Sequence, residues 1–143
     1  MPKEVKVNYV DHISIAVKDL KAAEKDIVNA YGWEVAGRYE DVGEKIRVVY
    51  FQVGPSAVEI MEDMDGTGEV AKFIEKRGEG VMVLSFHVDD CSKSLDILKK
   101  NKANVIDEKP RYAKDLDRYF AFVHPKVCHG ILTEVIEGKY PSL

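Results

Sequence analysis

The chain has 143 residues, of which 45% are apolar and 32% are charged, a composition normal for a globular protein that can bury a substantial core. Its net charge of −4, from 21 basic and 25 acidic residues, gives no sign of the basic surface that binds nucleic acid. No apolar stretch approaches the roughly 20 residues of a membrane span. We therefore expect neither a nucleic-acid partner nor a membrane partner.

The first half of the chain predicts a strand, a helix and three further strands. Residues 9–17 alternate in polarity and are rich in Val and Ile, which is typical of a strand. Asp19 then fits a helix N-cap and Gly32 fits the helix end, with apolar residues at helical spacing between them. Further strands are predicted at about 33–40, 45–53 and 56–62.

The second half predicts the same order of elements. A strand is expected at about 81–88, and Asp90 fits the N-cap of a helix that carries Leu95 and Leu98. Further strands are predicted near 104–107, 117–123 and 130–137. The joining segment, "GTGEVAKFIEKRGEG", predicts a short helix over 68–77 between glycine-rich turns. Each half therefore reads as a βαβββ module.

The two halves also match each other residue by residue. A shift of 71 residues aligns the two first strands and lays "RVVYFQVG" over "RYFAFVHP"; with four more residues in the second half, "VEIME" lies over "TEVIE". The pairs at the shift of 71 include Ser14 with Ser85, Arg47 with Arg118 and Phe51 with Phe122. We therefore predict an α+β fold in one domain, 1–143. Its two tandem βαβββ modules, about 8–62 and 80–137, would form a curved eight-stranded mixed sheet around a trough.

Three ionisable residues lie within the apolar strands of these modules. Residues two apart on a strand share one face, so His12 points the same way as Ser14. Glu59 and Glu134 occupy equivalent points of the two modules. An ionisable side chain among apolar ones is costly unless it is paired or bound to a metal, so this shared placement indicates a functional role.

Four stretches carry a resemblance to a known family: "DHISIAVKDL", "VEIMED", "AKFIEKRGEG" and "VHPKVCHGILTEVIE". In this order they resemble the vicinal oxygen chelate (glyoxalase/bleomycin-resistance) superfamily, and within it the methylmalonyl-CoA epimerases. The resemblance spans nearly the whole chain. "HPK" with a following glycine and strand glutamate, together with "RGEG", favours the epimerases over glyoxalase I.

The resemblance implies a divalent metal ion (Co²⁺, Mn²⁺, Ni²⁺ or Zn²⁺) held by His12, Glu59 and Glu134. The oxygen-rich ligand set favours Mn²⁺ or Co²⁺. A fourth ligand of the family, a histidine, falls at Val83, and its loss would weaken metal binding. His87 lies on the same strand face but roughly 13 Å further along, so it cannot replace the missing ligand.

The resemblance also implies a pair of proton carriers and substrate contacts. The family has a catalytic glutamate in the loop before the third strand, where this chain has Gly43 and then Glu44. Glu44 is therefore the candidate partner of Glu134 in moving the C2 proton. Lys126, in "HPK", and Arg47 are candidate contacts to an acyl-CoA substrate. A homodimer is expected.

Three functions stay open at this point. The first is metal-dependent epimerisation of methylmalonyl-CoA, the second is a glyoxalase I-like lyase or isomerase, and the third is a metal-free small-molecule binding protein with a degenerate site. The basic loop 109–118 fits either contact with CoA phosphates or a solvated charged segment. Cys91 and Cys128 form no disulfide pattern, which favours a reduced cytoplasm, and Cys128 is either a nucleophile or an incidental thiol.

Overall fold

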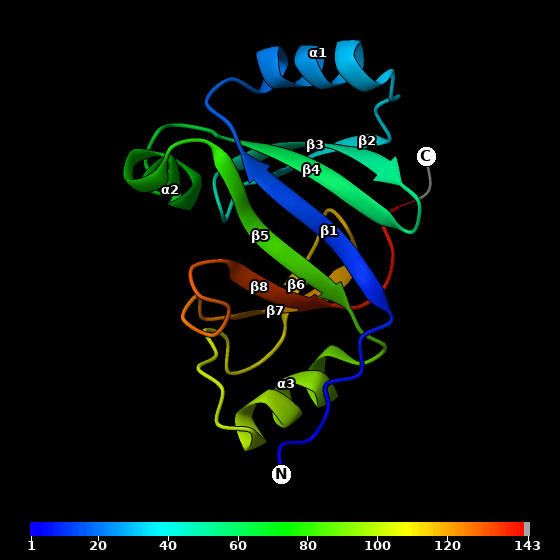
Figure 1. Cartoon of the computed structure of the whole chain (residues 1–143), viewed down its shortest axis with the longest axis vertical. Helices are drawn as coiled ribbons and strands as arrows, with labels where there is room; N and C mark the ends of the chain where they lie inside the picture. Colours follow the sequence, from blue (N-terminus) through cyan, green and yellow to red (C-terminus); the bar gives the residue numbers. More distant parts are fainter. Residues whose placement is uncertain (142–143) are drawn as a thin grey trace. The chain divides into compact units, whose positions relative to one another are not determined.

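A computed structural model describes residues 1–141 and gives each half of the chain the same order of elements (Figure 1). The first module contains β1 (Tyr9–Ala16), α1 (Leu20–Tyr31), β2 (Gly37–Asp41), β3 (Ile46–Val53) and β4 (Ser56–Asp63). After the linker helix α2 (Glu69–Arg77), the second contains β5 (Gly80–His87), α3 (Cys91–Lys100), β6 (Arg111–Ala113), β7 (Arg118–Val123) and β8 (Leu132–Ile136). The predicted tandem βαβββ modules are confirmed.

The strands of residues 1–141 are hydrogen bonded in the order β2-β3-β4-β1-β5-β8-β7-β6. In each module the first strand pairs in parallel with the fourth, and the remaining pairs are antiparallel. The predicted fold class, α+β with an eight-stranded mixed sheet, is therefore confirmed. None of the helices in this part of the chain is both long and apolar enough to cross a membrane.

The chain divides into two compact units. One, which we call the central unit, is His12–Met82; the other, the terminal unit, combines Met1–Asp11 with the described residues from Val83 onward. Each unit carries its own apolar core, so the two are described in turn.

In the central unit, α1 begins and ends where the sequence predicts. The Asp19 carboxylate accepts a hydrogen bond from the Ala22 N–H, and Gly32 ends the helix in the left-handed conformation, at φ 67°. The partly buried apolar side of α1 packs against a core cluster of Val17, Val49, Phe51 and Ile60. This cluster defines the α1 face of the strands, and the opposite face carries His12, Ser14 and Glu59 among apolar residues.

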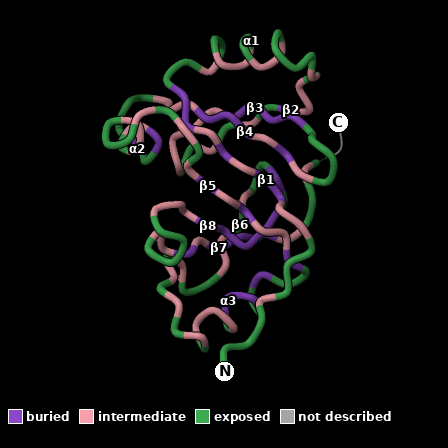
Figure 2. The backbone as a smooth tube through the Cα atoms, in the orientation of Figure 1, coloured by how far each residue is buried: buried purple, intermediate pink, exposed green. Residues whose placement is uncertain are grey.

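In the terminal unit, Asp90 caps α3 by accepting a hydrogen bond from the Lys93 N–H. The helix buries Cys91 and Leu95 against a cluster on β7, β8 and the residue after β5: Ala121, Val135 and Val88. Figure 2 shows buried segments along the strands, whereas α1 is intermediate or exposed along its length. The helices thus cover one face of each module's strands.

Two predicted strands are placed differently in the structure. The second strand begins at Gly37 rather than at 33, because Trp33 and Val35 pack on the α1 cluster instead of pairing. The strand predicted at 104–107 is wrong: Val105 makes only an isolated bridge. The strand in this place is β6, within the predicted basic loop 109–118, where it pairs with β7 in a hairpin.

The third strands of the modules align at a shift of 72 residues, not 71. Tyr50 is the strand partner of Glu59, and Phe122 is the strand partner of Glu134. The predicted pairings of Arg47 with Arg118 and of Phe51 with Phe122 are therefore wrong. A slip of one residue moves a side chain to the other face of a sheet, so the two arginines lie in different environments.

Candidate functional site

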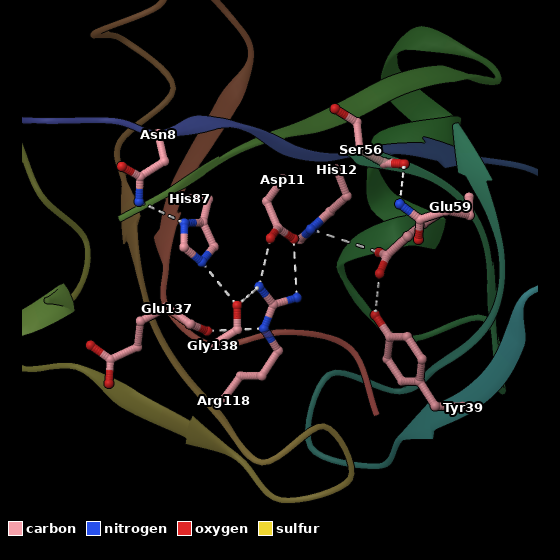
Figure 3. A network of polar contacts seen from close by, with 11 residues as sticks. Asn8, Asp11, His12, Tyr39, Ser56, Glu59, His87, Arg118, Glu137 and Gly138 are labelled. Carbon is pink, nitrogen blue, oxygen red and sulfur yellow. Dashed lines mark hydrogen bonds and ion pairs between the residues drawn. The ribbon is translucent and has the colours of Figure 1, made fainter. Parts of the chain in front are cut away.

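Strands β1 and β4 place His12 and Glu59 together in the central unit, on the face opposite α1. Ser14 is the strand partner of Glu59, and His12 lies two residues before Ser14 on the same face. His12 is 6% exposed and Glu59 is 2% exposed. The distance from His12 Nε2 to Glu59 Oε1 is 3.8 Å (Figure 3). The structure thus brings together two of the predicted metal ligands.

Both oxygens of the Glu59 carboxylate accept hydrogen bonds from hydroxyl groups. Ser14 Oγ donates to Oε1 at 2.9 Å, and Tyr39 Oη donates to Oε2 at 2.8 Å. These bonds offset part of the cost of burying the carboxylate. The position of Ser14, two residues after His12, was a signal that sequence reasoning could have used. Tyr39 gave no such signal, because it reaches Glu59 from a strand that is not adjacent to β4.

Glu134 occupies the equivalent place in the terminal unit. It is buried on β8, and its strand partners are Ser85 on β5 and Phe122 on β7. Ser85 is completely buried, and within residues 1–141 its Oγ has no hydrogen-bond partner. Val83 is also buried on β5 and shares the face of Ser85, so an apolar side chain stands where the resemblance implied a fourth ligand.

The donor set fits a divalent ion in part. Ligands bound at about 2.0–2.2 Å from one ion lie roughly 3–4 Å apart, which matches the separation of the His12 and Glu59 donor atoms. The hydroxyl groups on Glu59 are the outer partners that orient ligating carboxylates. Within residues 1–141, however, no group of three or more His, Cys, Asp or Glu side chains is arranged to hold a metal ion.

Glu44 lies in the four-residue turn between β2 and β3 and is partly buried. The backbone of this turn is fixed at several points. Asp41 Oδ1 accepts a hydrogen bond from the Glu44 N–H at 3.0 Å, and the Lys45 carbonyl accepts one from the Met64 N–H at 2.8 Å. The turn is thus held to Asp41, at the end of β2, and to Met64, just after β4.

Of the two candidate substrate contacts, Arg47 lies in the central unit and Lys126 in the terminal unit. Arg47 is on the α1 face, since it alternates with Val49, and it pairs with Glu62 Oε2 at 3.2 Å and Glu40 Oε1 at 3.8 Å. Lys126 is exposed in the turn that follows β7 in the terminal unit. The structure therefore does not bring Arg47 onto the face that holds the predicted ligands.

His87 is held in place by two hydrogen bonds and by stacking on an aromatic ring. Asn8 Nδ2 donates to its Nδ1 at 3.0 Å, so Nε2 carries the proton and donates to the Gly138 carbonyl at 2.9 Å. Its ring also stacks on Tyr9, with centroids 4.6 Å apart. These contacts tie the chain before β1 to the end of β8, and they agree with the expectation that His87 is no replacement ligand.

A buried ion pair joins Asp11 and Arg118 in the terminal unit (Figure 3). The two guanidinium Nη atoms donate to the two carboxylate oxygens of Asp11 at 2.6 and 3.1 Å. Burial acts against the charge of Arg118, but the hydrogen bonds and charge of Asp11 hold its pKa above the ordinary arginine value. This pair could not be expected from the sequence, because Asp11 and Arg118 lie 107 residues apart in the chain.

The two cysteines should differ sharply in reactivity. Burial, followed by the charges of nearby carboxylates, raises the pKa of Cys91 to about 12, whereas Cys128 is exposed. Because the thiolate is the reactive form, we expect iodoacetamide at pH 8 to label Cys128 and leave Cys91 unmodified in the folded protein. Peptide mass spectrometry would show this, and unfolding in urea should expose both sites. Comparable labelling of Cys91 in the folded protein would contradict the expectation.

Comparison with known proteins gives a consistent assignment. Residues 11–122 match the glyoxalase/bleomycin resistance protein/dioxygenase superfamily. The uncharacterized protein YqjC of Bacillus subtilis is 30% identical over 133 residues, which are 93% of this chain and 94% of that protein. The ethylmalonyl-CoA/methylmalonyl-CoA epimerase of Cereibacter sphaeroides is 25% identical over 130 residues, which are 90% of this chain and 97% of that enzyme.

A solved structure shows the same similarity in three dimensions. A variant of Streptomyces coelicolor methylmalonyl-CoA epimerase, in complex with 2-nitronate-propionyl-CoA, superposes with a TM-score of 0.87 at 27% sequence identity. The match covers 93% of this chain and 99% of that chain. The similarity therefore extends over both βαβββ modules.

Proposed function

Because the chain belongs to the glyoxalase/bleomycin resistance protein/dioxygenase superfamily, we propose that it epimerises methylmalonyl-CoA at C2. The observation that carries the proposal is the full-length similarity to proteins named as methylmalonyl-CoA epimerases. The buried pair of His12 and Glu59, with its hydroxyl donors, supports it as a site built from polar groups.

Epimerisation moves a proton and changes no oxidation state. The C2–H bond breaks on one face of the carbon, and a new C2–H bond forms on the other, so one group acts as base and a second as acid. We assign these roles to Glu44 and Glu134. The thioester enolate between the two steps carries negative charge that the site must stabilise.

We further propose that His12, Glu59 and Glu134 hold a divalent metal ion, with Mn²⁺ or Co²⁺ the best match for two carboxylates and one imidazole. Such an ion supplies Lewis-acid stabilisation of charge that develops on the substrate oxygens. Val83 removes a fourth ligand, so affinity should be lower than with a complete set. Lys126 and Arg47 are assigned to the CoA portion of the substrate, remote from C2.

Proton exchange tests both proposals. With the protein, Co²⁺ and methylmalonyl-CoA in D₂O, the C2 proton should be replaced by deuterium, as followed by NMR. Removing the metal with a chelator should stop the exchange, and adding Co²⁺ should restore it. Exchange that persists in metal-free protein would contradict the metal proposal and leave the epimerase proposal intact.

The alternative is a metal-free protein that binds a small molecule. It is favoured by Val83 at the ligand position and by the finding that no group of three metal-binding side chains is arranged for an ion within residues 1–141. It predicts acyl-CoA binding in calorimetry with no exchange under any metal condition. A glyoxalase-like enzyme would instead isomerise a thiohemiacetal and leave methylmalonyl-CoA unchanged.

A further inference from the structure

Tyr39 crosses one strand of the central unit to reach Glu59. It lies on β2, whereas Glu59 lies on β4, and β3 separates the two strands. Tyr50, the strand partner of Glu59 on β3, has its ring centroid 6.2 Å from that of Tyr39. The phenol of Tyr39 passes this ring and donates to Glu59 Oε2 at 2.8 Å.

The packing of the two tyrosines depends on a glycine in β2. A Cβ added to Gly37 would lie 2.3 Å from Tyr50 Oη, a distance that no real contact permits. The phenol of Tyr50 therefore lies directly over the Gly37 backbone, two residues before Tyr39. Tyr39 is held on one side by this packing, so its hydroxyl group has a defined place.

Two hydroxyl groups then determine how the Glu59 carboxylate is turned. The terminal torsion of a glutamate is broad, so the carboxylate alone would sample many orientations. Ser14 fixes Oε1 and Tyr39 fixes Oε2, and the same Oε1 lies 3.8 Å from His12 Nε2. Without the Tyr39 hydroxyl group, Oε2 loses this hydrogen bond, so the carboxylate is held less firmly in the direction of His12.

We propose that Tyr39 is a positioning residue that holds the Glu59 carboxylate in the orientation of a metal ligand beside His12. Its effect on the reaction rests on the function proposed above, whereas its effect on metal binding can be measured separately. Hydrogen-bonding partners of metal ligands typically contribute about 10–100-fold to metal affinity or activity. Tyr39 would contribute in this range without touching the metal.

The test compares three variants of the full chain by titrating metal-free protein with Co²⁺ in a calorimeter. Tyr39→Phe removes one oxygen and keeps the ring, and Ser14→Ala removes the other donor to Glu59. Both should bind Co²⁺ about 10–100-fold more weakly than the wild type. Tyr31→Phe is the control, because Tyr31 is exposed and stacks on Trp33 through its ring, so its affinity should be unchanged.

Proton exchange and thermal unfolding of the same variants separate positioning from stability. Below saturation with Co²⁺, Tyr39→Phe should exchange the proton more slowly than the wild type, and saturating Co²⁺ should restore most of the rate. A variant that is only less stable, measured at a temperature where it is folded, would bind Co²⁺ and exchange the proton like the wild type. If Tyr39→Phe binds Co²⁺ as tightly as the wild type, or if the wild type binds none, the positioning role is overturned. If Co²⁺ affinity falls but no variant exchanges the proton, the role stands and the epimerase proposal fails.

Discussion

Replacing Arg118 by methionine should lower the free energy of unfolding by about 3–5 kcal/mol, the usual effect of breaking a buried ion pair from one side. Arg118 is 1% exposed, and Asp11 is 4% exposed. The guanidinium also donates to the carbonyls of Glu137 and Gly138 at 3.0 and 3.1 Å. Its loss leaves a buried carboxylate and two carbonyls without this donor, so both the charge and the hydrogen bonds contribute to the effect.

Urea unfolding followed by circular dichroism would measure the effect. Arg47→Met is the matched control: this arginine is half exposed and pairs with surface carboxylates, so its loss should change stability by about 0–1 kcal/mol. The double variant Asp11→Leu with Arg118→Met should be more stable than Arg118→Met alone, because it leaves no buried charge. If Arg118→Met lowers the free energy of unfolding no more than Arg47→Met does, the buried ion pair does not stabilise the fold.

The elements that sequence predicted well are those whose signals are local. Asp19 and Asp90 cap helices through bonds to backbone groups three residues away, and Gly32 ends a helix through its own backbone conformation. Such contacts depend on neighbouring residues alone. The starts of α1 and α3 could therefore be placed to the residue.

The strand errors have a non-local cause. β6 exists because it pairs with β7: Tyr112 lies opposite Tyr119, with ring centroids 5.1 Å apart. The composition of its segment predicts a charged loop, and only the partner strand makes it a strand. The shift of 72 rather than 71 in the third strands has the same origin, because register is set by which side chains face the core. A match of letters cannot distinguish the two shifts.

The same distinction applies to the candidate site. Alternation along β1 was enough to expect His12 and Ser14 on one face, and the family resemblance implied that Glu59 lies near His12; the structure places the three together. The hydroxyl of Tyr39 could not be foreseen, since it reaches Glu59 over an intervening strand. Contacts between residues of one strand follow from the sequence, whereas contacts across several strands need the register.

Glu44→Gln should slow exchange of the C2 proton by about 10²–10⁴-fold, the range for one general acid–base group, while leaving Co²⁺ affinity unchanged. Glu134→Gln should reduce exchange at least as much and also weaken Co²⁺ binding, because Glu134 is assigned both as proton carrier and as ligand. Glutamine keeps the size of each side chain and removes the group that carries the proton. Deuterium incorporation followed by NMR, with Co²⁺ titrations in parallel, would separate the two residues.

Glu40→Gln provides the control for Glu44. Glu40 is an exposed carboxylate on β2, four residues before Glu44, and it pairs with Arg47 at 3.8 Å. Glu40 lies on the α1 face, because its strand partner is Arg47. Since its surface ion pair is also weak, Glu40→Gln should exchange the proton at a rate within about twofold of the wild type. If Glu44→Gln behaves like Glu40→Gln, the turn between β2 and β3 does not supply the second proton carrier. A fall in exchange for Glu44→Gln alone would instead show that Glu44, one residue beyond Gly43, supplies the proton carrier that the resemblance implied for this turn.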